Sequence, residues 1–255
     1  MRTNIETLPS GGLFYGGACP DGKLTIHEIT SDDEAILANQ TEDRGMLIDR
    51  LIDSCRIDKS VPYDDLLLCD QVYLMFAVRN LSYGPVYNFA LTCPSCRAAI
   101  QAAVNINDGI TVKRLNSDDH EIEEITLHSG LEIGISRLRV RDERDIAAYA
   151  KRIGNALAVD MKNPAYTYRL AKAIRTIKGQ PCLVHQAQTL FPLDSLDSLG
   201  LRTAIEDIEP GLELNLQHVC QGCGNRFVQP LTFSREFLQP RQSVYTRRPL
   251  VPKTA

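Results

Sequence analysis

The chain has 255 residues, of which 44% are hydrophobic, and its 28 basic and 32 acidic side chains give a formal net charge of −4. This composition can bury at least one ordinary hydrophobic core, and the length is compatible with one large or two small domains. The charge balance excludes the sequence-wide positive field on which non-specific nucleic-acid binding depends, and no run of about 18 uncharged apolar residues is present that would span a membrane.

The chain contains eight cysteines. Its first residues include no apolar segment of the kind found in secretory signals, so we expect folding in a reducing cytoplasm. Cysteines in that setting are more often metal ligands or buried thiols than members of a disulfide framework.

The first segment, residues 1–22, is rich in Gly and Pro and has no apolar periodicity. It predicts an arm that lies on another surface. Residues 23–29, KLTIHEI, alternate as a strand does. The residues SDDE at 31–34 have the pattern of a capping box, in which Ser31 caps the first turn and Glu34 reaches back, so a helix should start there.

Two apolar patterns of helical spacing follow. Their residues are Ile48, Leu51, Ile52 and Cys55 in the first, and Leu66, Cys69, Tyr73 and Phe76 in the second, which ends at Gly84 and Pro85. Cys55 and Cys69 fall on the apolar faces, which is typical of thiols that act as small core side chains.

Two C-x-x-C motifs, or knuckles, lie far apart in the sequence. Residues 89–100, FALTCPSCRAAI, place Cys93 and Cys96 between alternating stretches, although the alanines after Cys96 leave a helix open. Residues 214–228, LNLQHVCQGCGNRFV, repeat the arrangement with Cys220 and Cys223.

The four knuckle cysteines match the needs of a zinc site. A two-residue gap lets both thiolates of a pair point into one tetrahedral site, so Cys93, Cys96, Cys220 and Cys223 are the predicted ligands. Four thiolates leave no open coordination position, and the predicted Zn²⁺ is therefore structural. Because the knuckles lie so far apart, the metal would act as a clip that joins the first and last parts of the chain.

A thiol-redox role for Cys93 and Cys96 is the main alternative at the first knuckle. Redox pairs sit where a strand meets a helix N-terminus, whereas the residues after Cys96 can form a strand. His218 could replace a cysteine ligand, but with four thiols present we interpret it as an ordinary strand residue. The chain carries no P-loop, no dinucleotide-type glycine pattern, no H-E-x-x-H and no G-x-S-x-G, so we do not expect an enzyme.

Between the knuckles, residues 125–138 offer two alternating stretches around Ser129 and Gly130, which predicts a hairpin. Helices are predicted near residues 141–160, 164–178 and 194–208. Residues 24–37 and 133–146 share a strand, a polar step and an Asp-Glu pair that opens a helix. We interpret this similarity as a degenerate duplication in which each half-unit donates one knuckle to a shared metal.

The C-terminal residues 239–255 carry four basic and no acidic side chains. They predict either a disordered terminus or an arm that docks on an acidic groove of a partner. The expected parts are an N-terminal docking arm (1–22), a strand plus helical hairpin with the first knuckle (23–104), a central hairpin and helical segment (105–212), the second knuckle (213–238) and the basic tail (239–255).

Several segments together resemble a known family. They are LPSGGLFY, ITSDDEAIL, LIDSCRID, DDLLLCDQVYLMFAVRNLSYGPVYNFALTCPSC and a late CQGCGNRF that ends near FSREFL. They are similar to the baseplate hub and hub-assembly proteins of T-even-type and related contractile-tailed bacteriophages. The resemblance is most specific over residues 46–96. In that family the Leu-Pro-Ser-Gly opening, the Leu-Ser-Tyr-Gly segment and the cysteine pairs recur, and here they match residues 8–11, residues 81–84 and the four knuckle cysteines.

The resemblance implies a non-enzymatic structural or assembly part of a phage tail baseplate, made in the cytoplasm of a bacterial host and located in the virion tail. We expect an α+β fold of helices and short antiparallel strands with a zinc-ribbon-like module. The expected partners are other baseplate or tail proteins, bound through the N- and C-terminal arms, in a symmetric assembly of several copies, without a membrane and without nucleic acid. The alternatives are a zinc-ribbon adaptor that binds nucleic acid and a C-x-x-C thiol-redox protein. Cys19 and Cys182 have no assigned role.

Overall fold

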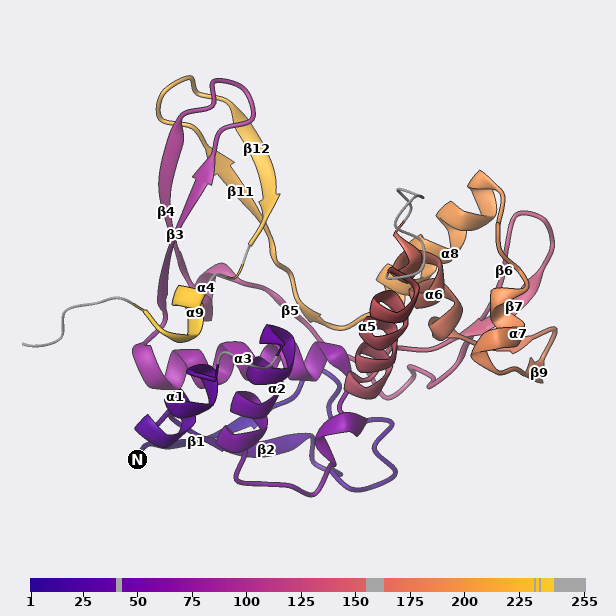
Figure 1. Cartoon of the computed structure of the whole chain (residues 1–255), viewed down its shortest axis with the longest axis horizontal. Helices are drawn as coiled ribbons and strands as arrows, with labels where there is room; N and C mark the ends of the chain where they lie inside the picture. The colour runs from indigo at the N-terminus through magenta and orange to yellow at the C-terminus, as the bar shows by residue number, and fades with distance from the viewer. Residues whose placement is uncertain (40–42, 155–162, 232, 234, 241–255) are drawn as a thin grey trace, which may run out of the picture.

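The computed structural model describes residues 1–39, 43–154, 163–231, 233 and 235–240. They form a first lobe (residues 3–83) and a second lobe (residues 123–208) that lie side by side, and a β-ribbon (residues 86–105 and 215–230) that projects from the first lobe (Figure 1). Within the described part of the chain, no helix has the length and apolar character needed to cross a bilayer.

The first lobe packs a strand pair and two helices around one central helix. Its elements are β1 (Thr3–Thr7) and β2 (Lys23–His27), which pair antiparallel, α1 (Ser31–Leu37), α2 (Arg44–Cys55), the 3-10 helix η1 (Tyr63–Asp65) and α3 (Leu68–Tyr83). Helix α3 is apolar nearly all round because it passes through the core, where Leu74 and Val78 are fully buried. Both predicted helices are confirmed, and Cys55 and Cys69 are buried in this core.

Helix α1 begins where the sequence predicts, but its capping box lies one residue earlier. Thr30 is the N-cap, and its side chain accepts a hydrogen bond from the backbone N–H of Asp33. The Asp33 carboxylate accepts in return from the backbone N–H of Thr30, at 2.9 Å. The pair predicted from Ser31 and Glu34 does not form, because Ser31 already has helical geometry.

The N-terminal residues 1–22 differ from the docking arm that the sequence predicts. They pack on the first lobe itself, since β1 completes the strand pair and Leu8 is fully buried. A side chain at Gly12 would meet the carbonyl of Cys19, and one at Gly22 would meet the backbone of Gly11. The glycines therefore allow a close backbone approach, and Cys19 is buried with its thiol on the carbonyl of Lys23.

The second lobe contains a four-stranded antiparallel sheet covered by helices. The strands, in sheet order, are β6 (Glu123–Thr126), β7 (Glu132–Ile135), β8 (Ile174–Ile177) and β9 (Gln180–Pro181), and the helices are α5 (Val140–Gly154), α6 (Pro164–Ala173), α7 (Val184–Gln188) and α8 (Ser195–Ile208). The hairpin around Ser129 and Gly130 is confirmed. The core includes Ile133, Ile135, Ile174 and Leu201.

The helix predicted over residues 164–178 is too long. It ends at Ala173, and the β-branched residues Ile174, Thr176 and Ile177 form strand β8, whose pairing with β7 buries Ile174 in the core. The local sequence allows either helix or strand in this segment, and pairing with β7 selects the strand. Residues 155–160 of the predicted helix 141–160 lie outside the described residues.

The ribbon joins the two distant parts of the chain. Its hairpins are β3 (Val86–Thr92) with β4 (Ala99–Asn105) and β11 (Asn215–Val219) with β12 (Arg226–Pro230). Short segments connect it to the lobes, namely α4 (Ile106–Gly109), β5 (Val112–Lys113), β10 (Gly211–Leu212), which pairs with β5, and α9 (Arg235–Leu238). In α9, Phe237 returns to the first core, against Phe76 and Tyr87.

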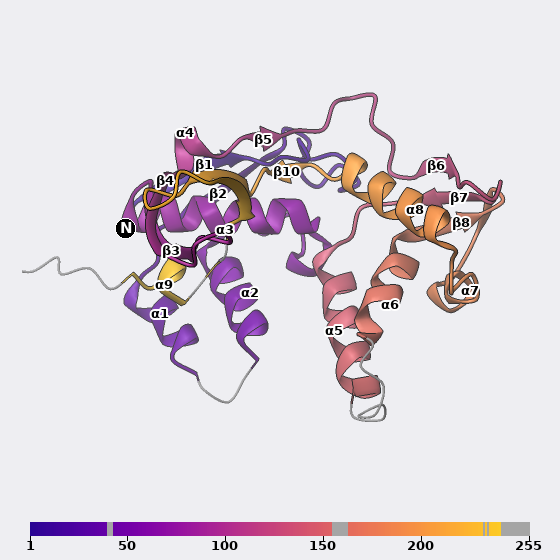
Figure 2. The same cartoon turned by 90° about the horizontal axis from the view of Figure 1, so that it is seen from above.

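The two lobes repeat one arrangement. Each begins with an antiparallel strand pair, β1–β2 or β6–β7, followed by two antiparallel helices, α1–α2 or α5–α6. A strand or bridge then lies beside the strand pair, and a further helix, α3 or α8, leads to a knuckle hairpin. The bridge of Ile26 to Arg56 in the first lobe takes the place of the pairing of Ile135 with Ile174 in the second. In Figure 2 the helix pairs α1–α2 and α5–α6 extend to the same side of the molecule.

Specific contacts recur as well as elements. The turn after β1 has the sequence Leu-Pro-Ser-Gly and the turn after β6 has Leu-His-Ser-Gly, and each leucine is buried. The backbone N–H of Ser10 donates to Asp70 at 3.0 Å, and the backbone N–H of Ser129 donates to Asp197 at 2.9 Å. Asp70 and Asp197 lie at the third residue of α3 and α8. These shared elements and contacts support the predicted duplication, although the second lobe contains the additional elements β9, α7 and β10.

The predicted α+β class is confirmed, since helices and short antiparallel strands form small sheets. The basic tail predicted over residues 239–255 lies outside the described residues from residue 241 onward.

Candidate metal centre

The two knuckles have the same backbone geometry. In the first, the N–H of Cys93 donates to the carbonyl of Ala98, and the N–H of Arg97 donates to the carbonyl of Cys93. In the second, Cys220 donates to Asn225 and Gly224 donates to Cys220, at closely similar distances of 2.9 Å each. The residue after the second cysteine has a positive φ in both, 60° at Arg97 and 71° at Gly224. These matching tight turns place the two cysteines of each pair at the end of a hairpin.

The ribbon brings the four predicted ligands together at its tip. Cys93 Sγ lies 3.8 Å from Cys223 Sγ, and Cys96 Sγ lies 3.6 Å from Cys220 Sγ. All four sulfur atoms lie within 4.8 Å of one another. Tetrahedral zinc with bonds of about 2.3 Å requires sulfur atoms about 3.8 Å apart, and the two pairs at 3.8 and 3.6 Å already have this spacing, so the donor set suits this ion.

The burial of the cysteines is also the same in the two knuckles. The first cysteine of each pair is buried, Cys93 completely and Cys220 to 1% exposure, while Cys96 and Cys223 are exposed. The site is thus shielded by the ribbon on one side and open to solvent on the other.

Backbone donors favour a thiolate at the first knuckle. The N–H of Cys96, followed by that of Ser95, lowers the pKa of Cys93 to about 6. The N–H of Ala98 acts in the same direction on Cys96, but the neighbouring thiols of Cys223 and Cys220 raise the pKa of Cys96 to about 11. Neighbouring thiolates repel each other, so ionisation of one cysteine makes ionisation of the next less favourable. A divalent cation bound between the sulfur atoms compensates this repulsion.

The surroundings of the site are those of a ribbon and not of a redox centre. Strand β4, not a helix, follows Cys96, so this knuckle does not have the strand-to-helix context of a redox pair. His218 does not contact the sulfur cluster but packs between the hairpins, 5.8 Å from the ring of Phe89 and 5.7 Å from the ring of Phe227. Its interpretation as a strand residue fits this position.

A second group of ligand-type residues, which the sequence did not indicate, lies between β2, α1 and α2. It consists of His27, Asp33 and Cys55. Both ring nitrogens of His27 face carbonyl oxygens, of Glu28 at 2.8 Å and Ser54 at 3.0 Å. Burial raises the pKa of Cys55 to about 12. His27 and Asp33 are engaged in hydrogen bonds that hold β2 and α1 on α2, and a thiol of the pKa of Cys55 is a poor metal ligand.

The remaining cysteines do not join the site. Cys19 and Cys69 are buried in the first lobe, and Cys182 is half-buried in the second, with its thiol 3.9 Å from the carbonyl of Ile174. Burial raises the pKa of the Cys182 thiol and that of Cys19. They are core thiols.

A family model described as T4 bacteriophage base plate protein matches residues 2–164, which is well over half of the chain. The match covers the first lobe, the first knuckle and the second lobe as far as the start of α6. Neither the curated proteins nor the solved structures gave a match.

Proposed function

We infer the function of this chain from its family, because it belongs to the T4 bacteriophage base plate proteins. It is a phage baseplate protein. Within that family we propose that it is a non-enzymatic structural or assembly component of the baseplate hub. Its four knuckle cysteines hold one Zn²⁺. The protein is made and assembled in the host and is located in the virion tail.

The convergence of the two knuckles carries this proposal. Cys93 and Cys96 follow the first lobe, while Cys220 and Cys223 follow the second, yet their sulfurs lie within bonding reach of one ion. Four thiolates fill the coordination sphere and leave no position for a substrate. The metal therefore joins the hairpin that follows the first lobe to the hairpin that follows the second lobe. Such a long-range cross-link suits a structural protein that must keep its shape under mechanical force.

We expect this protein to act by binding other baseplate or tail proteins. The N-terminal residues are occupied by the first lobe, so we do not retain them as a docking arm. The basic residues 239–255, which contain no acidic side chain, remain the proposed segment for binding an acidic neighbour.

Zinc content per chain tests the metal site. We expect one equivalent in the purified protein, none in the Cys220→Ser, Cys223→Ser double variant and none in the Cys93→Ser, Cys96→Ser double variant. Both double variants should unfold at lower denaturant concentration, and to a similar degree, because either change opens the same clip. Cys182→Ser is the matched control, since this thiol lies outside the ribbon, and it should keep its zinc.

A metal-free wild-type protein with a reversible disulfide between Cys93 and Cys96 would contradict the structural zinc and favour thiol-redox chemistry. The hub role has a separate test, which is mass spectrometry of purified phage particles and of their baseplate precursors. Presence in both indicates a permanent part, and presence in precursors alone indicates an assembly factor. Absence from both would refute the role.

A further inference from the structure

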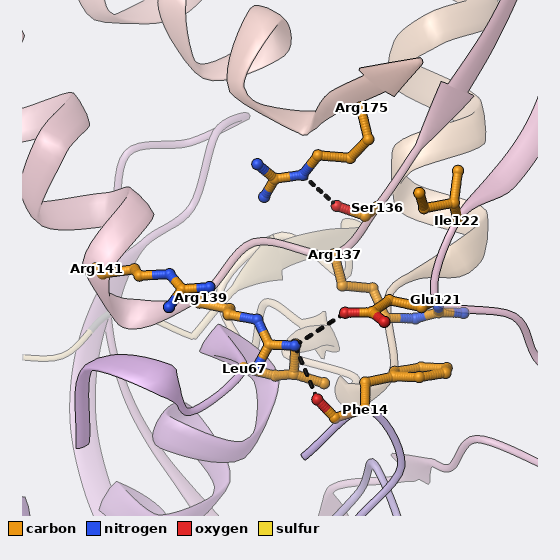
Figure 3. A pocket seen from close by; sticks show the side chains of 9 residues that line it. All are labelled: Phe14, Leu67, Glu121, Ile122, Ser136, Arg137, Arg139, Arg141 and Arg175. Atoms are coloured by element: carbon orange, nitrogen blue, oxygen red, sulfur yellow. Dashed lines mark hydrogen bonds and ion pairs between the residues drawn. The ribbon is translucent and has the colours of Figure 1, made fainter. Parts of the chain in front are cut away.

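A cavity of about 280 Å³ lies at the junction of the two lobes. Figure 3 shows it lined by four arginines, Arg137, Arg139, Arg141 and Arg175, with Phe14 from the first lobe and Glu121 as the one acidic side chain of its lining. We call it the arginine pocket. Its volume suits a small ion or a single polar side chain better than a large ligand.

Two of the arginines have a clear structural task. Arg139 donates to the carbonyls of Asp65 at 2.7 Å and Phe14 at 2.8 Å, and so ties the second lobe to the first. Arg137 donates to the carbonyls of Ile208 and His120, both at 2.8 Å. Its Nη2 atom is buried, makes no hydrogen bond within the described residues and lies 3.7 Å from a carboxylate oxygen of Asp119. Arg137 therefore adds positive potential at the base of the pocket that is only partly neutralised.

The other two arginines keep donors that the described residues do not use. Arg141 makes one ion pair, with Asp65, and its side chain is 57% exposed. Arg175 donates from Nε to Ser136 and from Nη2 to Asp142, which leaves Nη1 without a partner in the described part of the chain. A guanidinium carries five N–H donors in a planar fork, and this geometry matches the oxygens of a carboxylate or a phosphate.

Glu121 occupies the pocket as a weakly held anion. Among the described residues its carboxylate has one hydrogen-bond partner, Arg139, whose Nη2 donates to Oε1 at 3.1 Å, and its side chain is 62% exposed. An exposed ion pair of this kind contributes little to stability, so another anion can replace it at small cost.

The first lobe shows that the fold does not require these charges. Its corresponding strand-to-helix turn, from β2 to α1, carries Glu28, Thr30 and Asp32 where the second lobe carries Arg137, Arg139 and Arg141. Both turns nevertheless place an aspartate in the first turn of the helix, where it accepts from the backbone N–H three residues earlier. The arginine run is therefore an addition to the repeat.

We propose that the arginine pocket binds an oxyanion of another molecule, a carboxylate or a phosphate, which takes the place of Glu121 beside Arg139 and bonds to the unused donors of Arg141 and Arg175. A carboxylate would come from an acidic side chain of a neighbouring protein, and a phosphate from free phosphate or a phosphorylated compound. This site is independent of the zinc centre and goes beyond the proposed baseplate role.

Titration calorimetry on the full-length protein, with inorganic phosphate and with succinate as probes at constant ionic strength, tests the proposal. Constant ionic strength is needed because salt screens exposed charges. We expect one site with millimolar affinity for at least one probe. Arg141→Gln should weaken it at least fivefold, because it removes a charged donor, and Glu121→Gln should strengthen it several-fold, because it removes the competing anion.

Arg144→Gln is the matched control. It changes the net charge as Arg141→Gln does, but Arg144 pairs with Asp49 and Asp64 outside the pocket, so the affinity should change less than twofold. Binding of succinate assigns the site to protein carboxylates, and binding of phosphate alone assigns it to phosphoryl groups. No saturable binding of either probe, or an equal loss in Arg144→Gln and Arg141→Gln, would overturn the proposal, whatever the zinc content.

Discussion

The two lobes keep the same inner contacts and differ on their surfaces. In both, a serine in a glycine turn donates its backbone N–H to an aspartate at the start of a later helix. In both, an aspartate accepts from the backbone three residues before it, Asp33 in α1 and Asp142 in α5. The contacts that remain are those that satisfy backbone groups at turns and helix ends, which any copy of this fold needs.

Both turn-bonding aspartates, Asp70 and Asp197, are buried, but the lobes differ in the partners that these carboxylates have. Asp70 is fully buried and accepts both from Ser10 and from the Tyr15 hydroxyl at 2.5 Å, and this hydroxyl accepts in turn from the N–H of Leu67. Asp197 accepts only from the adjacent residues His128 and Ser129 among the described contacts, and the N–H of Ser129 donates to it at 2.9 Å. The first lobe therefore uses its aspartate as the centre of a polar network, while the second uses it to fix one turn.

The largest test of this difference is Asp70→Ala against Asp197→Ala. We expect Asp70→Ala to lower the free energy of unfolding by about 3 kcal/mol, because it leaves the N–H of Ser10 and the hydroxyl of Tyr15 without their buried acceptor. Asp197→Ala should cause a clearly smaller loss. Denaturant unfolding measures both, and equal losses would show that the two networks are equivalent.

Asp70→Asn separates the charge from the acceptor. Burial raises the pKa of Asp70, although hydrogen bonds from Ser10 and Tyr15 oppose that shift. The amide oxygen can still accept from Ser10, so we expect Asp70→Asn to lose less stability than Asp70→Ala.

The next test concerns the aspartates that begin α5 and α1. Burial opposes ionisation of both, but the N–H of Arg139 and the charges of Arg175 and Lys172 outweigh it and hold the pKa of Asp142 below its usual range. Hydrogen bonds from Ser54 and Thr30 do the same for Asp33. Asp142→Ala should cost about 2 kcal/mol at pH 7 and Asp33→Ala about 1 kcal/mol, because Asp142 also pairs with two cations.

The pH dependence of these losses has a fixed sign. A carboxyl group with a lowered pKa stabilises the fold above its unfolded pKa of about 3.9, and this stability is lost as the pH falls through the lower folded value. The difference between wild type and Asp142→Ala should therefore shrink below about pH 4. A difference that stays constant down to pH 2 would indicate that packing, and not the charge, accounts for the loss.

Glu209, which ends α8 at the junction of the lobes, should show the opposite sign. Burial raises its pKa to about 7, and the charge of Arg137 opposes this shift. The ionised group destabilises the fold, so its contribution to stability falls as the pH rises from about 4.5 to about 7. Glu209→Gln should gain about 1.5 kcal/mol at pH 8 and nothing at pH 4. The gain at pH 8 is smaller than the full pKa shift would give, because the half-buried amide also loses water.

The exposed Glu206 on the same helix gives the control for that measurement. Glu206→Gln removes the same charge from α8 without a buried group, and its unfolding free energy should follow that of the wild type from pH 4 to pH 8. A gain for Glu206→Gln equal to that of Glu209→Gln would point to net charge as the cause.

Local patterns predicted the parts of this molecule whose causes are local. The C-x-x-C spacing indicated the four ligands because it is itself the geometric requirement of the site, and apolar periodicity indicated α2 and α3. The packing of residues 1–22 was missed because it depends on a distant acceptor, Asp70, and on glycines that allow close backbone contact. Only one segment of the duplication was visible in the sequence, because loops of unequal length change the spacing between equivalent residues. The arginine pocket was missed because Arg175 reaches the arginines of residues 137–141 only through the pairing of β7 with β8, and Phe14 and Leu67 join its lining only when the two lobes pack.

The smallest expected effect distinguishes the two knuckles. Both need a positive φ after their second cysteine, which glycine adopts readily at position 224, while Arg97 adopts it at a cost. A side chain at Gly224 would meet no atom within 4 Å, so Gly224→Ala tests the backbone alone, and we expect a loss of about 1 kcal/mol. Arg97→Gly should gain at most about 0.5 kcal/mol, because relief of strain is offset by a more flexible unfolded chain. Zinc-loaded protein is required for both measurements, and a loss on Arg97→Gly as large as that on Gly224→Ala would mean that the Arg97 side chain, and not its φ, stabilises the first knuckle.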